Sequence, residues 1–218
     1  MPGASAQTPS EGRRRGRPRT GVREATLTAA IEVLAEAGAA GFSTKAVAAR
    51  AGVSEASIFY HFDDRLGLLE AVIFAQVGGY QELINELMGD RRPATVQAGV
   101  RTILEFLEDY FVRLLPGMSA MQSDPQMLTD FRERRSLELD RGPHRAIVPV
   151  QQYLRFEQAA GRVDADADLP VVATFLVGSA LQRAQLRRFG GRPRSLPSNR
   201  QLGKQLIRLL GGDEVRAD

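Results

Sequence analysis

Side chains with hydrogen-bonding groups are concentrated between Ser43 and Arg65, in the sequence STKAVAARAGVSEASIFYHFDDR. Hydroxyl, phenol and imidazole groups can bond to base edges and phosphates when a helix presents them together. Residues 55 to 62 carry three of these groups within about two helical turns. Their chemistry suits recognition of a nucleic acid.

The elements that position these groups are two short helices joined by a tight turn at residues 51–54. Gly52 supplies the permissive backbone that a sharp reversal needs, and Val53 fills the gap between the helices. The inward face of the first helix carries small apolar residues at helical spacing, namely Val47, Ala48 and Ala51. Such a unit can place its second helix in the major groove of DNA.

The second helix is predicted to begin after Ser54, whose side-chain oxygen can accept from a free amide of the first turn. Ile58 and Phe62 are four residues apart and so turn inward. The outward set is small or polar: Glu55, Ala56, Ser57, Tyr60 and His61. An Ala-rich helix, a Gly turn and a second helix also occur by chance in helical proteins, which is the alternative interpretation.

The order of residues from Ser54 onward is more specific than that. The order begins with a cap, a small residue, an apolar residue, an aromatic pair and His-Phe. It continues with an acidic-basic helix start and the leucines at 66, 68 and 69. This order resembles the tetracycline repressor (TetR) family of transcriptional regulators over residues 22–77. The resemblance implies an all-α fold of about nine helices, with an N-terminal three-helix helix-turn-helix DNA-binding domain and a C-terminal helical domain for ligand binding and dimerisation.

The resemblance also implies roles for single residues. Thr44 matches a position that meets a phosphate, Lys45 one that reaches a base or phosphate, and Arg65 the usual Lys that starts the fourth helix. We expect the DNA-contacting set to be Arg13, Arg14, Arg15, Arg17, Arg19, Thr44, Lys45, Ser54, Glu55, Ala56, Ser57, Tyr60, His61 and Arg65. Two residues depart from the pattern: Glu55 stands where Lys or Gln is frequent, and Phe59 replaces a Tyr that often binds a phosphate. Glu55 could accept from a cytosine amino group but would repel the phosphate backbone.

Basic charge is concentrated in an N-terminal arm. The 218-residue chain has a formal charge of +3, and five of its 29 basic residues lie in Arg13–Arg19. The segment from Val22 to Arg65 instead holds more acidic than basic residues. Within the arm, Arg-Gly-Arg-Pro resembles the core of an AT-hook, an extended strand that can enter a narrow A·T minor groove. A solvated basic tail without defined contacts is the alternative.

Composition and boundaries fit a globular protein with one or two domains. No Cys is present, which excludes disulfides and thiolate metal sites and fits a reducing cytoplasm. The N-terminus lacks the apolar stretch of a secretion signal and is expected to be disordered through about Gly12. We expect an arm over 1–20, the DNA-binding domain over 21–65, the effector and dimerisation domain over 66–212 and a tail over 213–218, in a cytoplasmic protein associated with the nucleoid when bound to DNA.

Apolar periodicity predicts helices along the rest of the chain. A first helix is expected to stop at Gly38, with Phe42 closing the small core beside it. One long helix is predicted from Leu66 to about Met88, and another from about Val96 until Pro116-Gly117 terminates it. A further helix is expected from about Pro149 through Ala160 with a stop at Gly161, and the acidic residues 164, 166 and 168 suit an acidic loop or a helix start.

The segment Leu169–Leu181 is apolar around most of a helix, so it must be covered on most sides. It is too short to span a bilayer. The candidates are a helix buried within one subunit or, as we prefer, a seam between two subunits, where Gly178, Ser179, Ala180 and Ala184 would let a second helix approach. The expected interface is Val171, Phe175, Gly178, Leu181, Leu202, Leu206, Leu209 and Leu210. Two subunits would read a palindrome.

The resemblance implies an unknown small effector bound among the helices of the larger domain. The aromatic and Met residues that could line such a cavity are Tyr80, Phe106, Tyr110, Met118, Met121, Met127, Phe131, Tyr153 and Phe156. The alternative interpretation, favoured for each residue taken alone, is ordinary core. This lining would suit an apolar or aromatic molecule.

The sequence shows no catalytic or cofactor motif. His61 and His144 are far apart, no phosphate-binding Gly loop is present, and Gly117-Met118-Ser119-Ala120-Met121 lacks the final Gly of a nucleophile elbow. We therefore expect no enzyme activity, no cofactor, no metal and no membrane segment. Three hypotheses remain: a dimeric ligand-responsive repressor on double-stranded DNA, which we favour; an architectural DNA binder driven by the arm; and an apolar-ligand carrier that has lost DNA binding.

Overall fold

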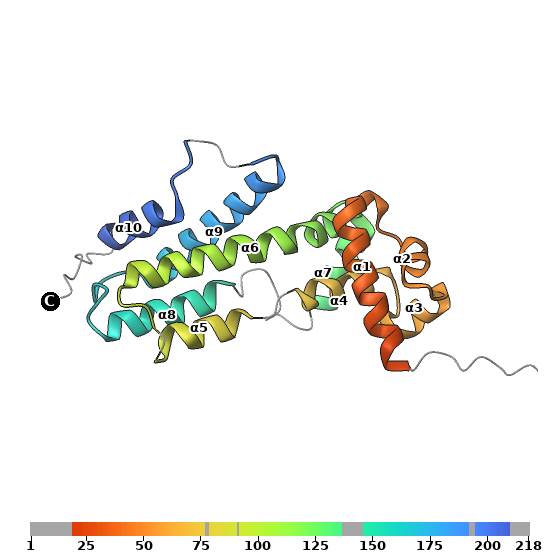
Figure 1. Ribbon diagram of the computed structural model, residues 1–218, viewed down its shortest axis with the longest axis horizontal. Helices are drawn as coiled ribbons and strands as arrows, with labels where there is room; N and C mark the ends of the chain where they lie inside the picture. The colour runs from red at the N-terminus through yellow and green to blue at the C-terminus, as the bar shows by residue number, and fades with distance from the viewer. Residues whose placement is uncertain (1–18, 77–78, 91, 137–145, 192–194, 210–218) are drawn as a thin grey trace, which may run out of the picture.

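The chain folds into α-helices. The computed structural model describes residues 19–76, 79–90, 92–136, 146–191 and 195–209. Ten helices lie in this part of the chain, against about nine expected, so the all-α prediction is confirmed (Figure 1). They are α1 (Arg19–Gly41), α2 (Thr44–Ala51), α3 (Glu55–Phe62), α4 (Arg65–Ala75), α5 (Tyr80–Met88), α6 (Val96–Gln122), α7 (Pro125–Ser136), α8 (Ile147–Ala159), α9 (Leu169–Arg188) and α10 (Asn199–Leu209).

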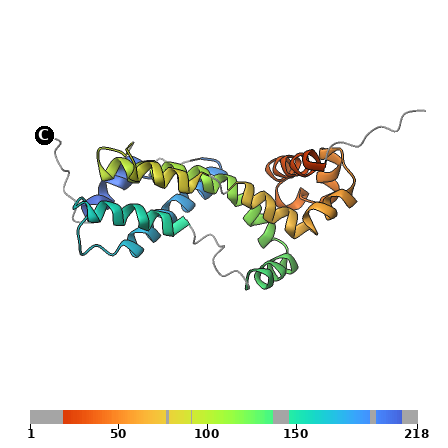
Figure 2. The same cartoon turned by 90° about the horizontal axis from the view of Figure 1, so that it is seen from below.

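The helices form two groups at opposite ends of the molecule, as both views show (Figures 1 and 2). Helices α1 to α4 surround a small core that includes Phe42, Val47, Ile58 and Leu69. Helices α5, α6, α8, α9 and α10 surround a larger core. Each group therefore has its own apolar centre, as expected for a DNA-binding domain followed by a helical domain.

Helix α6 connects the two groups, which corrects the prediction that Pro116-Gly117 ends it. The helix continues through both residues to Gln122, so its N-terminal part packs in the larger core while Ala120 and Met121 pack in the smaller one. A Cβ at Gly117 would lie 2.8 Å from Ile73 Cγ1, which shows that α4 crosses α6 closely at this point. Buried packing on both sides thus outweighs the hydrogen bond that Pro116 removes.

The predicted long helix from Leu66 to Met88 is also wrong, because it is two helices. α4 ends at Ala75, and α5 begins at Tyr80 after Gly79, whose φ of +86° lies outside the right-handed helical region. The apolar spacing remains in phase across this break, which is why the sequence suggested one helix.

Other predicted boundaries are confirmed. Gly38, with a φ of +63°, breaks α1 where the stop was predicted, although a short helical segment continues to Gly41; Gly161 follows α8 with a φ of +70°. Pro149 lies in the first turn of α8, where its missing N–H costs little. Asp168 caps α9, because its Oδ1 accepts from the Val171 amide at 3.1 Å.

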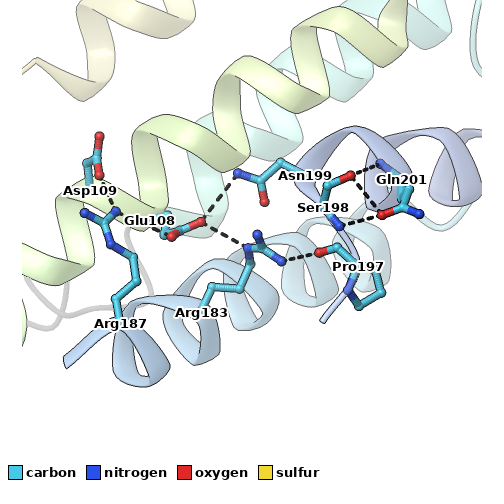
Figure 3. A network of polar contacts seen from close by, with 8 residues as sticks. All are labelled: Glu108, Asp109, Arg183, Arg187, Pro197, Ser198, Asn199 and Gln201. Atoms are coloured by element: carbon cyan, nitrogen blue, oxygen red, sulfur yellow. Dashed lines mark hydrogen bonds and ion pairs between the residues drawn. The ribbon is translucent and has the colours of Figure 1, made fainter. Parts of the chain in front are cut away.

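A buried network of charged side chains holds α9 and the start of α10 against α6 (Figure 3). Arg183 Nε donates to Glu108 Oε2 at 3.0 Å, and both side chains are at most 2% exposed. Arg183 also donates to the Pro197 carbonyl at 2.6 Å, and Asn199 Nδ2 donates to Glu108 at 3.4 Å. Since a buried charge requires a partner, these residues fix the three helices in one arrangement.

Candidate nucleic-acid interface

The turn between α2 and α3 has the backbone that the sequence predicted. Ser43 caps α2 by accepting from the Ala46 amide at 3.1 Å, and Gly52 ends it with a φ of +67° and a ψ of +35°. The Val53 amide then donates to the Ala48 carbonyl at 3.1 Å, which ties the reversal to the helix it leaves. The two helices are therefore fixed relative to one another by local bonds.

Helix α3 buries one face and exposes the other. Its cap is Ser54, whose Oγ accepts from the Ser57 amide at 3.2 Å and lies 2.9 Å from the Ser57 hydroxyl. Ile58 and Phe62 are buried in the small core, whereas Tyr60 is 67% exposed. The remaining outward residues are the exposed Glu55 and Ala56 and the half-buried Ser57 and His61, which matches the predicted division of faces.

An aromatic edge follows along the same helix. The rings of Tyr60 and His61 meet edge to face with centroids 5.1 Å apart, and Phe59 is 46% exposed. Arg23 of α1 places its guanidinium 5.2 Å from the centre of the Phe62 ring, which holds this cation beside the C-terminal end of α3. Aromatic and cationic groups thus occupy the C-terminal half of the helix, beyond its polar start.

Arg50 holds two helices together. Its guanidinium bonds to Glu36 at 2.5 Å and to Glu32 at 3.2 Å, both on α1. The hydrogen bond to Glu36 raises the pKa of Arg50, and the same bond lowers the pKa of Glu36. This positive charge is therefore used to fasten α2 to α1.

The turn after α3 is joined to α7 by two ion pairs. Arg65 donates to Asp124 at 3.0 Å, and Arg134 of α7 pairs with Asp64, the residue that caps α4. Asp124 itself accepts from the Met127 amide at 3.1 Å. Burial raises the pKa of Asp64, but the hydrogen bonds from Arg134 and the Gly67 amide and the positive charge of Arg134 together outweigh it, so the net pKa is lowered. Asp124 holds the guanidinium of Arg65 within the protein. The expected contact of Arg65 with DNA stays a prediction.

Sequence reasoning missed one contact between the two helices. The Thr44 hydroxyl at the start of α2 donates to Glu55 Oε1 at the start of α3, with an oxygen-to-oxygen distance of 2.6 Å. Eleven residues separate the partners, so no helical periodicity relates them. Lys45 beside them is exposed. The arm residues Arg13, Arg14, Arg15 and Arg17, and the side chain of Arg19, lie outside the described part of the structure.

Three of the expected effector contacts come together in the larger domain. The rings of Tyr80 and Phe106 stack with centroids 5.4 Å apart, and Tyr110 lies 6.1 Å from Tyr80. The buried Tyr80 hydroxyl donates to the Ala146 carbonyl at 2.6 Å, and burial raises its pKa. Tyr153 of α8 is fully buried in the larger core, Phe156 lies on the same helix, and Met118 packs against that core.

The other candidates lie elsewhere. Met121 and Met127 are buried in the smaller core and Phe131 packs against it. They therefore support the helix-turn-helix domain and do not share surroundings with the Tyr80 cluster.

The expected dimer residues fall into two groups. Val171 and Phe175 are 47% and 67% exposed, and Gly178 of the same helix is exposed too. Ala180 and Ala184 are fully buried within the subunit, so the expectation that they would receive a second helix is wrong. Leu181, Leu202 and Leu206 are half-buried against the larger core, while Leu210 and the side chain of Leu209 lie outside the described part.

No cluster of three or more His, Cys, Asp or Glu side chains suited to a metal ion occurs among the residues that the structure describes. Nor does any helix in this part of the chain have the length and apolar content needed to cross a bilayer.

Comparison with protein families identifies the N-terminal domain. Residues 27–72 match the family model described as "Bacterial regulatory proteins, tetR family". This domain belongs to the TetR family. The match covers α2, α3 and most of α1 and α4, and so contains the turn between α2 and α3. No curated protein matches the chain.

Solved structures extend the likeness to the whole fold. Salmonella enterica GusR has a TM-score of 0.65 at 18% identity, over 90% of this chain and 98% of that one. A cysteine mutant of the TetR family transcriptional regulator CifR, complexed with 26-bp double-strand operator DNA, has a TM-score of 0.63 at 18% identity, over 91% and 100%. Bacillus subtilis FadR in complex with stearoyl-CoA has a TM-score of 0.57 at 15% identity, over 86% and 96%. The chain therefore has the fold of these proteins over about nine-tenths of its length.

Proposed function

We propose that this TetR-family protein is a dimeric repressor that binds an inverted-repeat operator and is released from it by a largely apolar effector. The observation that carries the proposal is the exposed polar face of α3, held by the Gly52 turn and the Ser54 cap. A short helix presented in this way can reach base edges in the major groove. The operator-bound CifR structure, which has the same fold, supports this assignment.

One face of α9 supports dimerisation. Its exposed residues recur at alternating intervals of four and three, the spacing of a seam between two helices, and none is charged: Val171, Phe175, Gly178, Gln182, Gln185 and Phe189. A Cβ at Gly178 would meet no atom within 4 Å, so its small size serves no packing inside the subunit. A mid-helix Gly costs about 1 kcal/mol relative to Ala. Close approach of a partner's helix accounts for that cost.

The Tyr80, Phe106 and Tyr110 rings support an apolar effector. They lie where α5, α6 and α8 meet, and the Tyr80 hydroxyl bonds to the residue before α8. A molecule that inserts among these rings would displace helices that pack on α6, and α6 reaches the helix-turn-helix domain. FadR, with the same fold, is described in complex with stearoyl-CoA. Release of DNA requires that the effector bind the incompetent arrangement more tightly.

Selection of DNA from a random library by the full-length protein tests the proposal. We expect an inverted repeat to be enriched, and we expect Tyr60→Ala to weaken binding to it. Tyr60 is exposed on α3, so this substitution should leave the fold intact. Phe74→Ala, which changes an exposed aromatic residue on α4, serves as the matched control. Enrichment of A·T-rich DNA without symmetry would contradict the proposal.

A second candidate function has one observation in its favour. Arg50 and Arg65 are held by acidic side chains, so the helix-turn-helix domain offers few cations to phosphates. An architectural protein that binds DNA mainly through the arm would fit this distribution. Deletion of residues 13–19 would then abolish binding, whereas Tyr60→Ala would have little effect. In the specific repressor, both changes weaken binding.

A further inference from the structure

Glu55 is an acidic residue at the point where α3 begins, with its side chain exposed. The nearby Ser54 and Ser57 interact with each other: their hydroxyls lie 2.9 Å apart, and Ser54 also caps the helix. Thr44, from the preceding helix, donates to Glu55 Oε1 at 2.6 Å. One carboxylate oxygen is thus fixed by α2 and the second remains able to accept another hydrogen bond.

The bond from Thr44 restricts the carboxylate before any DNA arrives. A Glu side chain otherwise loses considerable rotamer freedom when it is immobilised at an interface. Here the restraint comes from the neighbouring helix of the same reading unit, and the N-terminal end of α3 provides a favourable place for a negative charge. The described residues supply no ion-pair partner for Glu55, so no cation in this part of the chain neutralises its charge.

An ionised carboxylate in the major groove can only accept. Guanine presents two acceptors there, and thymine presents an acceptor and a methyl group. Adenine pairs its amino donor with an adjacent acceptor, whereas cytosine presents its amino donor alone. Next to a phosphate or a base without a free donor, the carboxylate would lose its water and face another acceptor. This penalty lowers the affinity for other sequences relative to the one with cytosine.

We propose that Glu55 is a specificity-determining residue that selects a cytosine in each half-site through the exocyclic amino group, and that Thr44 positions its carboxylate. This inference rests on the proposed function, because it requires α3 to lie in the major groove. Thr44 thereby acts through Glu55, and the phosphate contact that the resemblance assigns to Thr44 is not its main role in this chain.

The experiment compares sequence profiles. DNA is selected from a random library with the full-length wild-type protein and the E55A, E55Q and T44V variants, and the E105A variant serves as a control with the same loss of charge from an exposed position on α6. We expect the wild-type profile to require cytosine at one symmetric position by about 5- to 150-fold per half-site. E55A should lose that preference alone, T44V should reduce it, and E105A should leave it unchanged.

A second measurement isolates the amino group. Cytosine at the selected position is replaced by 2-pyrimidinone, which lacks the amino group, and affinity is measured by titration. The wild-type protein should lose affinity and E55A should not, while thermal unfolding establishes that the variants remain folded. An inverted repeat with an unchanged E55A profile would overturn the inference and leave the proposed function standing. If E55A bound all DNA sequences more tightly by the same factor, without a change in the sequence profile, the effect would be one of charge only. That result would also overturn the inference. If the wild-type protein enriched no inverted repeat, the proposed function would fail and this inference with it.

Discussion

Replacing Glu108 by Gln should destabilise the protein far more than a surface substitution. Glu108 and Arg183 are 1% and 2% exposed, and Glu108 is the carboxylate that Arg183 contacts, at 3.0 Å (Figure 3). Gln keeps the shape and one acceptor oxygen but removes the negative charge, so the Arg183 cation would stay buried with neutral acceptors, namely this amide oxygen and the Pro197 carbonyl. Removal of one partner of a buried ion pair costs about 3–5 kcal/mol. Total stabilities are about 5–15 kcal/mol, so the loss is a large fraction.

The measurement is urea unfolding followed by far-UV circular dichroism, at one fixed protein concentration because a dimer is stabilised by mass action. Asp109→Asn is the matched control: Asp109 is 60% exposed and pairs with the half-exposed Arg187, so its loss should cost about 1 kcal/mol or less. A double variant, Glu108→Gln with Arg183→Met, should recover much of the loss, because no unpaired charge remains. Equal effects of the two single substitutions, or a double variant no better than Glu108→Gln, would refute this reasoning.

Three further outcomes are expected. Phe175→Glu should shift sedimentation from dimer to monomer. The exposed two-thirds of Phe175 would be buried in the dimer once in each subunit, and this burial is worth about 2–4 kcal/mol in total. The substitution Val148→Ala, at an exposed position on α8, should leave the dimer intact. Asp63→Gly should raise the free energy of unfolding by about 1 kcal/mol, because its φ of +67° strains an L-residue, and a loss would contradict this. Asp64→Asn should destabilise the protein at neutral pH and progressively less in acid. Because the pKa of Asp64 is lowered in the folded state, its charge stabilises the protein at pH values above its pKa in the unfolded chain. This contribution disappears as the pH falls through its pKa in the folded protein. A loss of stability that does not depend on pH would exclude the ion pair with Arg134 as the cause.

The turn could be predicted because its determinants are local. Gly52 must take a positive φ, Ser54 must cap, and the inward positions follow the helical period, so each conclusion depends on residues a few places apart. The family resemblance depended on the same residues, and the match over 27–72 confirms it.

The errors arose where distant contacts decide the structure. Pro116 suggested a helix end, but burial against α1 and α4 keeps α6 intact through it. Ala180 and Ala184 were assigned to a partner because small residues permit close approach, and α6 of the same subunit uses that property. The bond from Thr44 to Glu55 has no sequence signal at all, since it depends on how two helices are set across the turn.

The distribution of cations has a consequence for how the domain meets DNA. Arg50 and Arg65 hold α1, α2, α4 and α7 together, which gives the reading helix a rigid support but removes two charges from the phosphate contacts. Each phosphate contact contributes about 0.9 to the slope of log affinity against log salt. If the arm supplies the missing contacts, deletion of residues 13–19 should reduce this slope by several units while the enriched sequence stays the same. An unchanged slope would show that Lys45, Arg23 and the backbone amides supply the phosphate contacts without the arm.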